Sequence, residues 1–289
     1  MLSFEYKIPS APARKETAVP QPSPALLKAL DHSARRVSVT VFDSVDSTNN
    51  IAKAHANEDT PALYIARAQT GGRGRLGRSF HSPAHTGLYM TVAYTTDRPL
   101  TEAVRITAAA AVATVSAIEA LTDKHPAVKW VNDIYLNGCK IGGILTEAVT
   151  RGDGSHRMIV GLGINLTTAD FPEGLRAPAA SLFAPGNKDA IPGDFPDILA
   201  GEIARRLLEL ADPNATGEFP RGAWGEPCLD FYRRRLLYVG ETVVCTRGSE
   251  SFTGMVQGVD GDYSLLVESE SRLLTLSSGE ISVRPAERT

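Results

Sequence analysis

Residues 69–80 read Gln-Thr-Gly-Gly-Arg-Gly-Arg-Leu-Gly-Arg-Ser-Phe, and this stretch decides how the rest of the chain is interpreted. Glycine at this density leaves the backbone almost unconstrained. The three arginines, Arg73, Arg75 and Arg78, repel one another unless an anion lies among them. We therefore expect a loop that is mobile when empty and that orders around a phosphate or carboxylate, which arginine binds with two hydrogen bonds.

Three interpretations of this loop compete. Gly72, Gly74 and Gly77 have the spacing of a dinucleotide-binding fingerprint, and a strand-like run, residues 63–68, precedes them. That fingerprint must open a helix, and Pro83 excludes one here. An Arg/Gly segment that binds nucleic acid and a clamp for a small-molecule phosphate remain.

Composition speaks against nucleic acid as the main partner. The chain has 289 residues, 43% hydrophobic and 22% charged, and its net charge is −3, whereas a sequence-independent DNA binder normally carries a basic surface. The cysteines Cys139, Cys228 and Cys245 are widely spaced and odd in number, which favours a reducing cytoplasm. The longest apolar run, residues 108–113, is too short to span a bilayer, and no signal peptide is visible. We expect no DNA and no membrane among the partners.

Composition and hydrophobic pattern divide the chain into three parts. Residues 1–35 begin with a proline-rich stretch and form a flexible leader, too short for a winged-helix DNA-binding domain of about sixty residues. Residues 36–237 form the catalytic domain. Residues 238–289 read as short strands with turns at the spacing of a small β-barrel.

Strands and helices are interleaved in the catalytic domain, which indicates an α+β fold with a mixed central sheet. An alanine-rich helix over residues 101–122 should pack closely on that sheet. Asn137-Gly138 predicts a hairpin between strands 128–136 and 140–147. Further strands are expected at 37–43, 62–68, 88–94 and 158–165, and further helices at 197–210 and 224–236.

Polar residues interrupt these elements at several places. Ser47, Thr48 and Asn49 begin a helix, where they either cap it or hydrogen-bond a compact polar group. Lys140 begins an otherwise apolar strand, and a lysine there is costly to bury unless an anion compensates it. Gly143, with its neighbour Gly142, lets a ligand lie against that strand.

Taken in order, these stretches resemble the motif set of the biotin–protein ligases. The motifs are Ser47-Thr-Asn, Gly72-Arg-Gly-Arg-Leu-Gly-Arg, Lys129-Trp-Val-Asn-Asp-Ile with Lys140-Ile-Gly-Gly-Ile-Leu, and Gly161-Leu-Gly-Ile-Asn. The resemblance covers roughly residues 40–285 and implies a short form without the amino-terminal DNA-binding domain. It departs at Val131, where the family usually has proline, and at Phe80, where it often has tryptophan.

The resemblance implies a fold similar to class II aminoacyl-tRNA synthetases, with a carboxy-terminal SH3-like barrel. It also implies a reaction in which biotin and ATP give biotinoyl-5′-AMP, which a lysine of a biotin carboxyl carrier domain then attacks. The residues that correspond to biotin-binding positions are Ser47, Thr48, Asn49, Gln69, Gly72, Arg73, Gly74, Arg75, Lys140 and Gly143. Those on the ATP side are Arg73, Arg78, Phe80, Asn132, Asp133 and Asn165, with Asp133 a candidate for Mg²⁺. Lys140, Arg73 and Arg75 would carry the catalysis.

Two alternatives stay open. Lipoate ligases and octanoyltransferases share the fold but, as families, do not show the Gly-Arg-Gly-Arg loop. A non-enzymatic DNA-binding repressor belongs to a different class, and the acidic net charge weighs against it.

Overall fold

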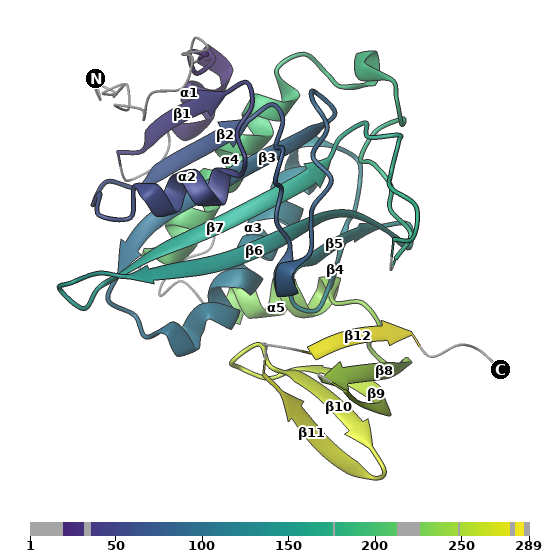
Figure 1. Cartoon of the computed structure of the whole chain (residues 1–289). Coiled ribbons are helices and arrows are strands. Elements are labelled where there is room, and N and C mark those ends of the chain that lie inside the picture. The colour runs from purple at the N-terminus through teal and green to yellow at the C-terminus, as the bar shows by residue number, and fades with distance from the viewer. Residues whose placement is uncertain are drawn as a thin grey trace.

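Figure 1 shows the chain as a computed structural model, which describes residues 20–31, 36–175, 177–212, 226–247, 249–277 and 281–285. Most of the expected leader, residues 1–19 and 32–35, lies outside this part. Its described portion contains helix α1, Pro24–Leu30, which begins at the N-cap Ser23. Leu26 and Leu30 of α1 are buried, and α1 packs against the later helix α4, Phe195–Ala211.

The catalytic part is built on a mixed sheet of seven strands in the order β1-β2-β3-β7-β6-β5-β4. Only β1 and β2 pair in parallel, and every other neighbouring pair is antiparallel. The strands are β1 Ser38–Phe42, β2 Ala62–Ala66, β3 Gly87–Thr96, β4 Ala127–Lys129, β5 Asp133–Leu136, β6 Cys139–Thr150 and β7 His156–Asn165. The expected α+β class with a central mixed sheet is confirmed.

Helices cover both faces of this sheet (Figure 1). Helix α3, Ala103–Leu121, packs on β5 and β6, and α4 packs on α3 and β3. The short α2, Thr48–Ala54, contacts β2, β3 and β7 from the opposite face. Helix α5, Glu226–Arg235, leads towards the C-terminal strands. The side chains of β3 alternate between these layers, so that Met90 and Val92 belong to the large core, whereas Ala93 belongs to a small cluster under α2.

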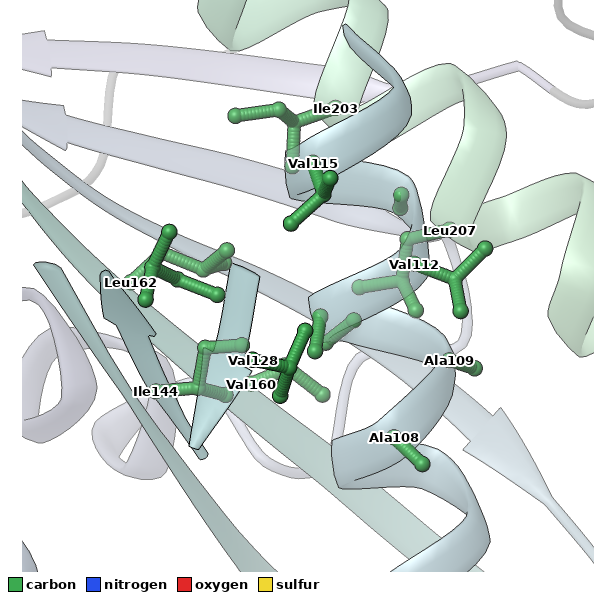
Figure 2. Packing of buried hydrophobic residues seen from close by; sticks show 14 of the residues in the cluster. Ala108, Ala109, Val112, Val115, Val128, Ile144, Val160, Leu162, Ile203 and Leu207 are labelled. Atoms are coloured by element: carbon green, nitrogen blue, oxygen red, sulfur yellow. The ribbon is translucent and has the colours of Figure 1, made fainter. Parts of the chain in front are cut away.

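Small residues explain why α3 lies so close to its neighbours. Ala108 and Ala109 are fully buried, and Figure 2 shows them on the same helix as Val112 and Val115, with Leu207 of α4 beside it. Alanine has a high helix propensity and little volume, so it favours the helix and permits a close approach. The helical segment Leu100–Leu121 is long and apolar enough to cross a membrane, because an 18-residue window within it has a mean hydropathy of 1.5. However, 72% of that window is buried inside the protein, as expected of a core helix.

The hairpin prediction was right about the turn and wrong about one strand. Asn137 and Gly138 both have positive φ and join β5 to β6. The expected continuous strand 128–136 is instead two strands, β4 and β5, which pair antiparallel with each other. The chain reverses over Trp130, Val131 and Asn132, and the Trp130–Val131 peptide bond is cis.

The C-terminal part is a five-stranded sheet in the order β11-β10-β9-β8-β12. Its strands are β8 Thr242–Arg247, β9 Glu250–Val259, β10 Leu265–Ser269, β11 Arg272–Leu276 and β12 Ile281–Pro285. This antiparallel sheet agrees with the expected SH3-like fold. Trp130 Nε1 donates a hydrogen bond of 2.8 Å to the Tyr263 carbonyl, and Arg105 forms an ion pair with Asp262. The two sheets therefore share one continuous core.

The close packing of α3 predicts that Ala109→Leu destabilises the protein. A larger side chain at this fully buried position must displace its neighbours, so we expect the free energy of unfolding to fall by about 1–3 kcal/mol. Ala120→Leu on the same helix is the matched control, because Ala120 is exposed, and its effect should stay within about 0.5 kcal/mol. Urea denaturation measures both. Equal effects of the two substitutions would contradict the packing argument.

Candidate active site

A cavity of about 140 Å³ lies between the sheet, helix α2 and the loop that contains residues 69–80. Thirteen of the side chains or glycines predicted from sequence line it: Ser47, Thr48, Asn49, Gln69, Arg73, Gly74, Arg75, Arg78, Phe80, Asn132, Asp133, Lys140 and Gly143. These residues come from segments far apart in the chain. The fold therefore brings the separate motifs to one place.

Main-chain hydrogen bonds give the Gly-Arg loop a definite shape. The Phe80 amide donates to the Gly72 carbonyl at 2.8 Å, and the Gly74 amide donates to the Arg78 carbonyl at 2.7 Å. Leu76 at the tip is 55% exposed and has a φ of 58°, an uncommon conformation for a residue other than glycine. The loop is thus an irregular hairpin with one 3₁₀ turn at Arg75–Gly77, and no α-helix follows the glycines, in agreement with the exclusion of a dinucleotide fingerprint.

Two arginines anchor this loop to the body of the protein. Arg75 Nη1 donates to Asn132 Oδ1 at 3.0 Å, and Arg73 Nη1 donates to Asn50 Oδ1 at 3.0 Å. The amide nitrogen of Asn132 in turn donates to the Ile144 carbonyl at 3.0 Å. These anchors were not expected from the sequence, which predicted that only a bound anion would order the loop.

The start of helix α2 forms one end of the cavity. Ser47 is the N-cap residue, yet its side chain makes no capping hydrogen bond and is buried. Gln69 Oε1 accepts from the Thr48 amide at 2.9 Å and from the Thr48 hydroxyl at 3.2 Å. Gln69 Nε2 donates to the Ser82 hydroxyl at 3.1 Å. Ser47 therefore occupies the N-cap position, as expected, but its hydroxyl does not cap the helix and is left for another partner.

Asn49 is 3% exposed, and both ends of its amide are held. Its Oδ1 lies 2.7 Å from the Thr91 hydroxyl, and its Nδ2 donates to Glu147 Oε2 at 2.9 Å. A Cβ at Gly161 would lie only 2.1 Å from Asn49 Oδ1. Glycine is thus required on β7 to make room for this side chain.

Glu147 lies just behind this end and offsets two cations. Its carboxylate receives Lys53 Nζ at 2.6 Å and lies 3.7 Å from Arg73 Nη2. Burial tends to raise the pKa of Glu147, but the hydrogen bonds from Lys53 and Asn49 and the nearby positive charges outweigh it and hold the pKa below its usual value. Glu147 is therefore ionised and ties α2 to the Gly-Arg loop.

Two of the lining residues are paired with each other: Lys140 Nζ forms an ion pair of 2.6 Å with Asp133 Oδ1. A Cβ at Gly143 would lie 3.3 Å from Lys140 Nζ and 3.6 Å from Asp133 Oδ1, so the glycine leaves space for the pair. The Lys140 amide and carbonyl bond to residues 178 and 180, which fixes the strand around it.

Positive charge dominates the lining of the cavity. Arg73, Arg75, Arg78, Lys129 and Lys140 contribute cations, and Asp133 contributes the one carboxylate among the lining residues. Burial lowers the pKa of the Arg75 guanidinium, Asp133 raises it and the nearby charge of Arg78 lowers it further. A chain with a net charge of −3 thus concentrates an excess of four positive charges around this cavity. Such a site favours an anion.

Two predicted residues do not line the cavity. Gly72 is part of the loop, and a Cβ there would be 2.4 Å from the Phe80 carbonyl oxygen, so its role is to let the hairpin close. Asn165 at the end of β7 is 5% exposed, and its amide donates to the Ala180 carbonyl at 3.1 Å. Asn165 therefore holds the loop after β7.

Other lining residues were missed. Gly163 makes room for Phe80, whose ring atoms would lie 2.4 Å from a Cβ there. Lys129 begins one of the motifs quoted from the sequence, and its position between the apolar residues Val128 and Trp130 was an available signal. Met90, Leu145 and Leu162 looked like ordinary core residues, and Val283 comes from the C-terminal sheet. Their part in the cavity depends on tertiary structure.

The described residues contain no cluster of three or more histidine, cysteine, aspartate or glutamate side chains that could hold a metal ion. Asp133 alone offers a carboxylate to the cavity. Mg²⁺ is often held by one or two carboxylates together with substrate phosphates, so the residues fit a metal that arrives with a nucleotide.

Comparison with known sequences agrees with this geometry. The profile of the biotin/lipoate A/B protein ligase family matches residues 41–165, and that of the biotin protein ligase C-terminal domain matches residues 238–284. The bifunctional ligase/repressor BirA of Bacillus spizizenii is 32% identical over 246 residues, which cover 83% of this chain and 72% of that protein. The biotin--[acetyl-CoA-carboxylase] ligase of Paracoccus denitrificans is 29% identical over 82% of this chain and 96% of its own length.

The fold has solved counterparts as well. The biotin protein ligase from Aquifex aeolicus, solved in complex with biotin and ATP, superposes with a TM-score of 0.66. It is 24% identical, and the alignment covers 86% of this chain and 99% of that one. The two matched domain profiles and the 32% identity to the Bacillus spizizenii protein show that the chain belongs to the biotin protein ligases of the biotin/lipoate A/B protein ligase family.

Proposed function

We propose that this enzyme activates biotin with ATP and transfers the biotinoyl group to a lysine of a biotin carboxyl carrier domain. In the first step a biotin carboxylate oxygen attacks the α-phosphorus of ATP, and pyrophosphate leaves. In the second, the lysine amine attacks the acyl carbon, loses a proton, and AMP leaves. The observation that carries the proposal is one cavity that joins a buried polar end at α2 to a strongly cationic end.

The chemistry requires two anions to be brought together, and it requires no protein nucleophile. Biotin would bind with its ureido group at Ser47, Thr48, Asn49 and Gln69, beside the apolar side chain of Leu145. The hydroxyl of Ser47, unused in the helix cap, supports this assignment. The carboxylate would then point towards Lys140 on β6.

The cationic side chains would hold the nucleotide. Lys140 offsets the negative charge that develops between the carboxylate and the α-phosphate, and Arg73 and Arg75 close over the reacting groups. Arg78, Phe80 and Asn132 line the same cavity and would contact the nucleotide, with Phe80 offering an aromatic surface. Mg²⁺ brought by ATP would meet Asp133 and would supply charge neutralisation at the phosphates. Asp133 would hold the metal from its place beside Lys140, with which it pairs at 2.6 Å.

A direct test is ATP–pyrophosphate exchange with biotin, lipoate and octanoate supplied separately. Exchange that depends on biotin supports the proposal, and exchange that depends on lipoate or octanoate supports the other activities of this fold. No exchange with any acid would contradict both.

The three free cysteines, two of them buried, support a reducing cytoplasm as the place of the reaction.

We expect Lys140→Ala to fold normally and to form biotinoyl-AMP about a hundred to a thousand times more slowly, the usual effect of losing one charge-stabilising group. The reason is that Lys140 supplies a cation to the lining of the cavity, 2.6 Å from Asp133. Single-turnover formation of biotinoyl-AMP measures the effect, and Lys188→Ala at an exposed position is the control. A near wild-type rate would make Lys140 a structural residue.

Asn49→Ala should weaken biotin binding by about 1–3 kcal/mol, because it leaves a polar group unsatisfied in the buried α2 end of the cavity, where Asn49 accepts a hydrogen bond from the buried Thr91 hydroxyl. ATP binding alone should barely change. Calorimetric titration of each ligand measures both effects, and Asn57→Ala, at an exposed position on the segment after α2, is the control. Equal loss of both ligands would indicate that the start of α2 had collapsed.

Arg75→Gly should still form biotinoyl-AMP but release it faster. The substitution removes the hydrogen bond to Asn132 and adds backbone freedom, so the loop closes less often over the intermediate. The measurements are the off-rate of the adenylate in a chase and the biotinylation of an added protein that is not a carrier. Lys140→Ala should not label bystander proteins, since it makes little intermediate. Unchanged retention with normal synthesis would rule out a lid role for the loop.

A further inference from the structure

The ammonium group of Lys129 lines the cavity without an anionic partner of its own. Its Nζ lies 5.7 Å from the centre of the Tyr135 ring, and no carboxylate of the described residues lies within ion-pair distance of it. Lys129 is in register with Asp133 on the next strand, but the Asp133 carboxylate is bound to Lys140 at 2.6 Å. The cavity therefore contains a cation whose nearest carboxylate is already engaged.

The surroundings of Lys129 make this arrangement unfavourable in the absence of an anion. Burial lowers the pKa of its ammonium group, Asp133 raises it, and the positive charges of Lys140, Arg284 and Arg78 lower it further. A half-buried ammonium among like charges gains most from a ligand that carries several negative charges.

The sheet order places Lys129 at the end of the cavity away from α2. Helix α2 contacts β2, β3 and β7, whereas Lys140 lies on β6, Asp133 on β5 and Lys129 on β4. Along this order, Lys140 stands between the α2 end and Lys129. Val283 of β12 also lines the cavity, so the C-terminal sheet borders this end.

We infer that Lys129 binds the β- and γ-phosphates of ATP and the pyrophosphate that leaves. This inference rests on the proposed function and adds a residue for its leaving group. If the biotin carboxylate meets the α-phosphate at Lys140, the remaining phosphates continue towards Lys129. When the bond between the α-phosphorus and its bridging oxygen breaks, the electron pair stays on the pyrophosphate oxygen. Lys129 offsets that added negative charge.

The test compares Lys129→Met with Lys129→Arg and with Lys188→Met as the control at an exposed position. Methionine keeps an unbranched stem beside Tyr135 but removes the charge. We expect Lys129→Met to slow biotinoyl-AMP formation about a hundredfold, the order found for one lost charge-stabilising contact. Transfer from supplied biotinoyl-AMP to a carrier should stay within about twofold of wild type, because pyrophosphate takes no part in it. Lys129→Arg should recover most of the first rate.

A second measurement does not depend on turnover. Calorimetric titration of inorganic pyrophosphate with Mg²⁺ onto the ligand-free protein should show binding about tenfold weaker in Lys129→Met and unchanged in Lys188→Met. Unchanged pyrophosphate affinity would overturn the inference, and so would equal losses in both half-reactions with a lower Tm, which mark a structural residue. A third outcome separates the two proposals. If wild type binds pyrophosphate more tightly than Lys129→Met but forms no biotinoyl-AMP, the phosphate site is supported and only the proposed function is overturned.

Discussion

The ion pair between Lys140 and Asp133, 2.6 Å long, is the contact on which the cavity depends. It joins the two strands of the Asn137-Gly138 hairpin and gives the cationic lining its one carboxylate. The cavity keeps an excess of positive charge nonetheless, and such an excess costs stability in a ligand-free protein. The same excess makes the site selective for substrates that bring their own negative charge. Electrostatic strain in the empty enzyme and affinity for the nucleotide are thus two aspects of one arrangement.

The parts of the fold and of the cavity that could be predicted from the sequence are those marked by a local sequence pattern. The start of α2, the Gly-Arg loop and the hairpin with Lys140 each carry a local pattern, and all three border the cavity. The break of strand 128–136 escaped prediction, because its residues favour extended structure and the reversal at Trp130 is fixed by contacts with the C-terminal sheet. Val283 could not be found locally, since only docking of the two sheets brings it to the cavity.

The segment from Lys129 to Asp133 serves two parts of the protein at once. Lys129 and Asp133 face the cavity, whereas Trp130 Nε1 hydrogen-bonds the Tyr263 carbonyl of the C-terminal part. Tyr263 also packs edge-on against Tyr232 of α5, with ring centres 5.4 Å apart. The position of the C-terminal sheet and the shape of the cavity near Lys129 are therefore mechanically linked. This linkage explains why a small appended sheet belongs to the same hydrophobic core as the catalytic part.

The glycines of β7 limit how this enzyme could be redesigned. Gly161 and Gly163 leave room for Asn49 and Phe80, and glycine has no side chain left to remove. An engineer who wants a bulkier acyl substrate cannot deepen the floor of the pocket and must trim its walls, at Leu145 or Met90. Met90 also belongs to the main core, so widening the pocket there sacrifices packing. Leu145, which is only partly buried and lies outside that core, is the position where substrate range can change at the lowest cost to folding.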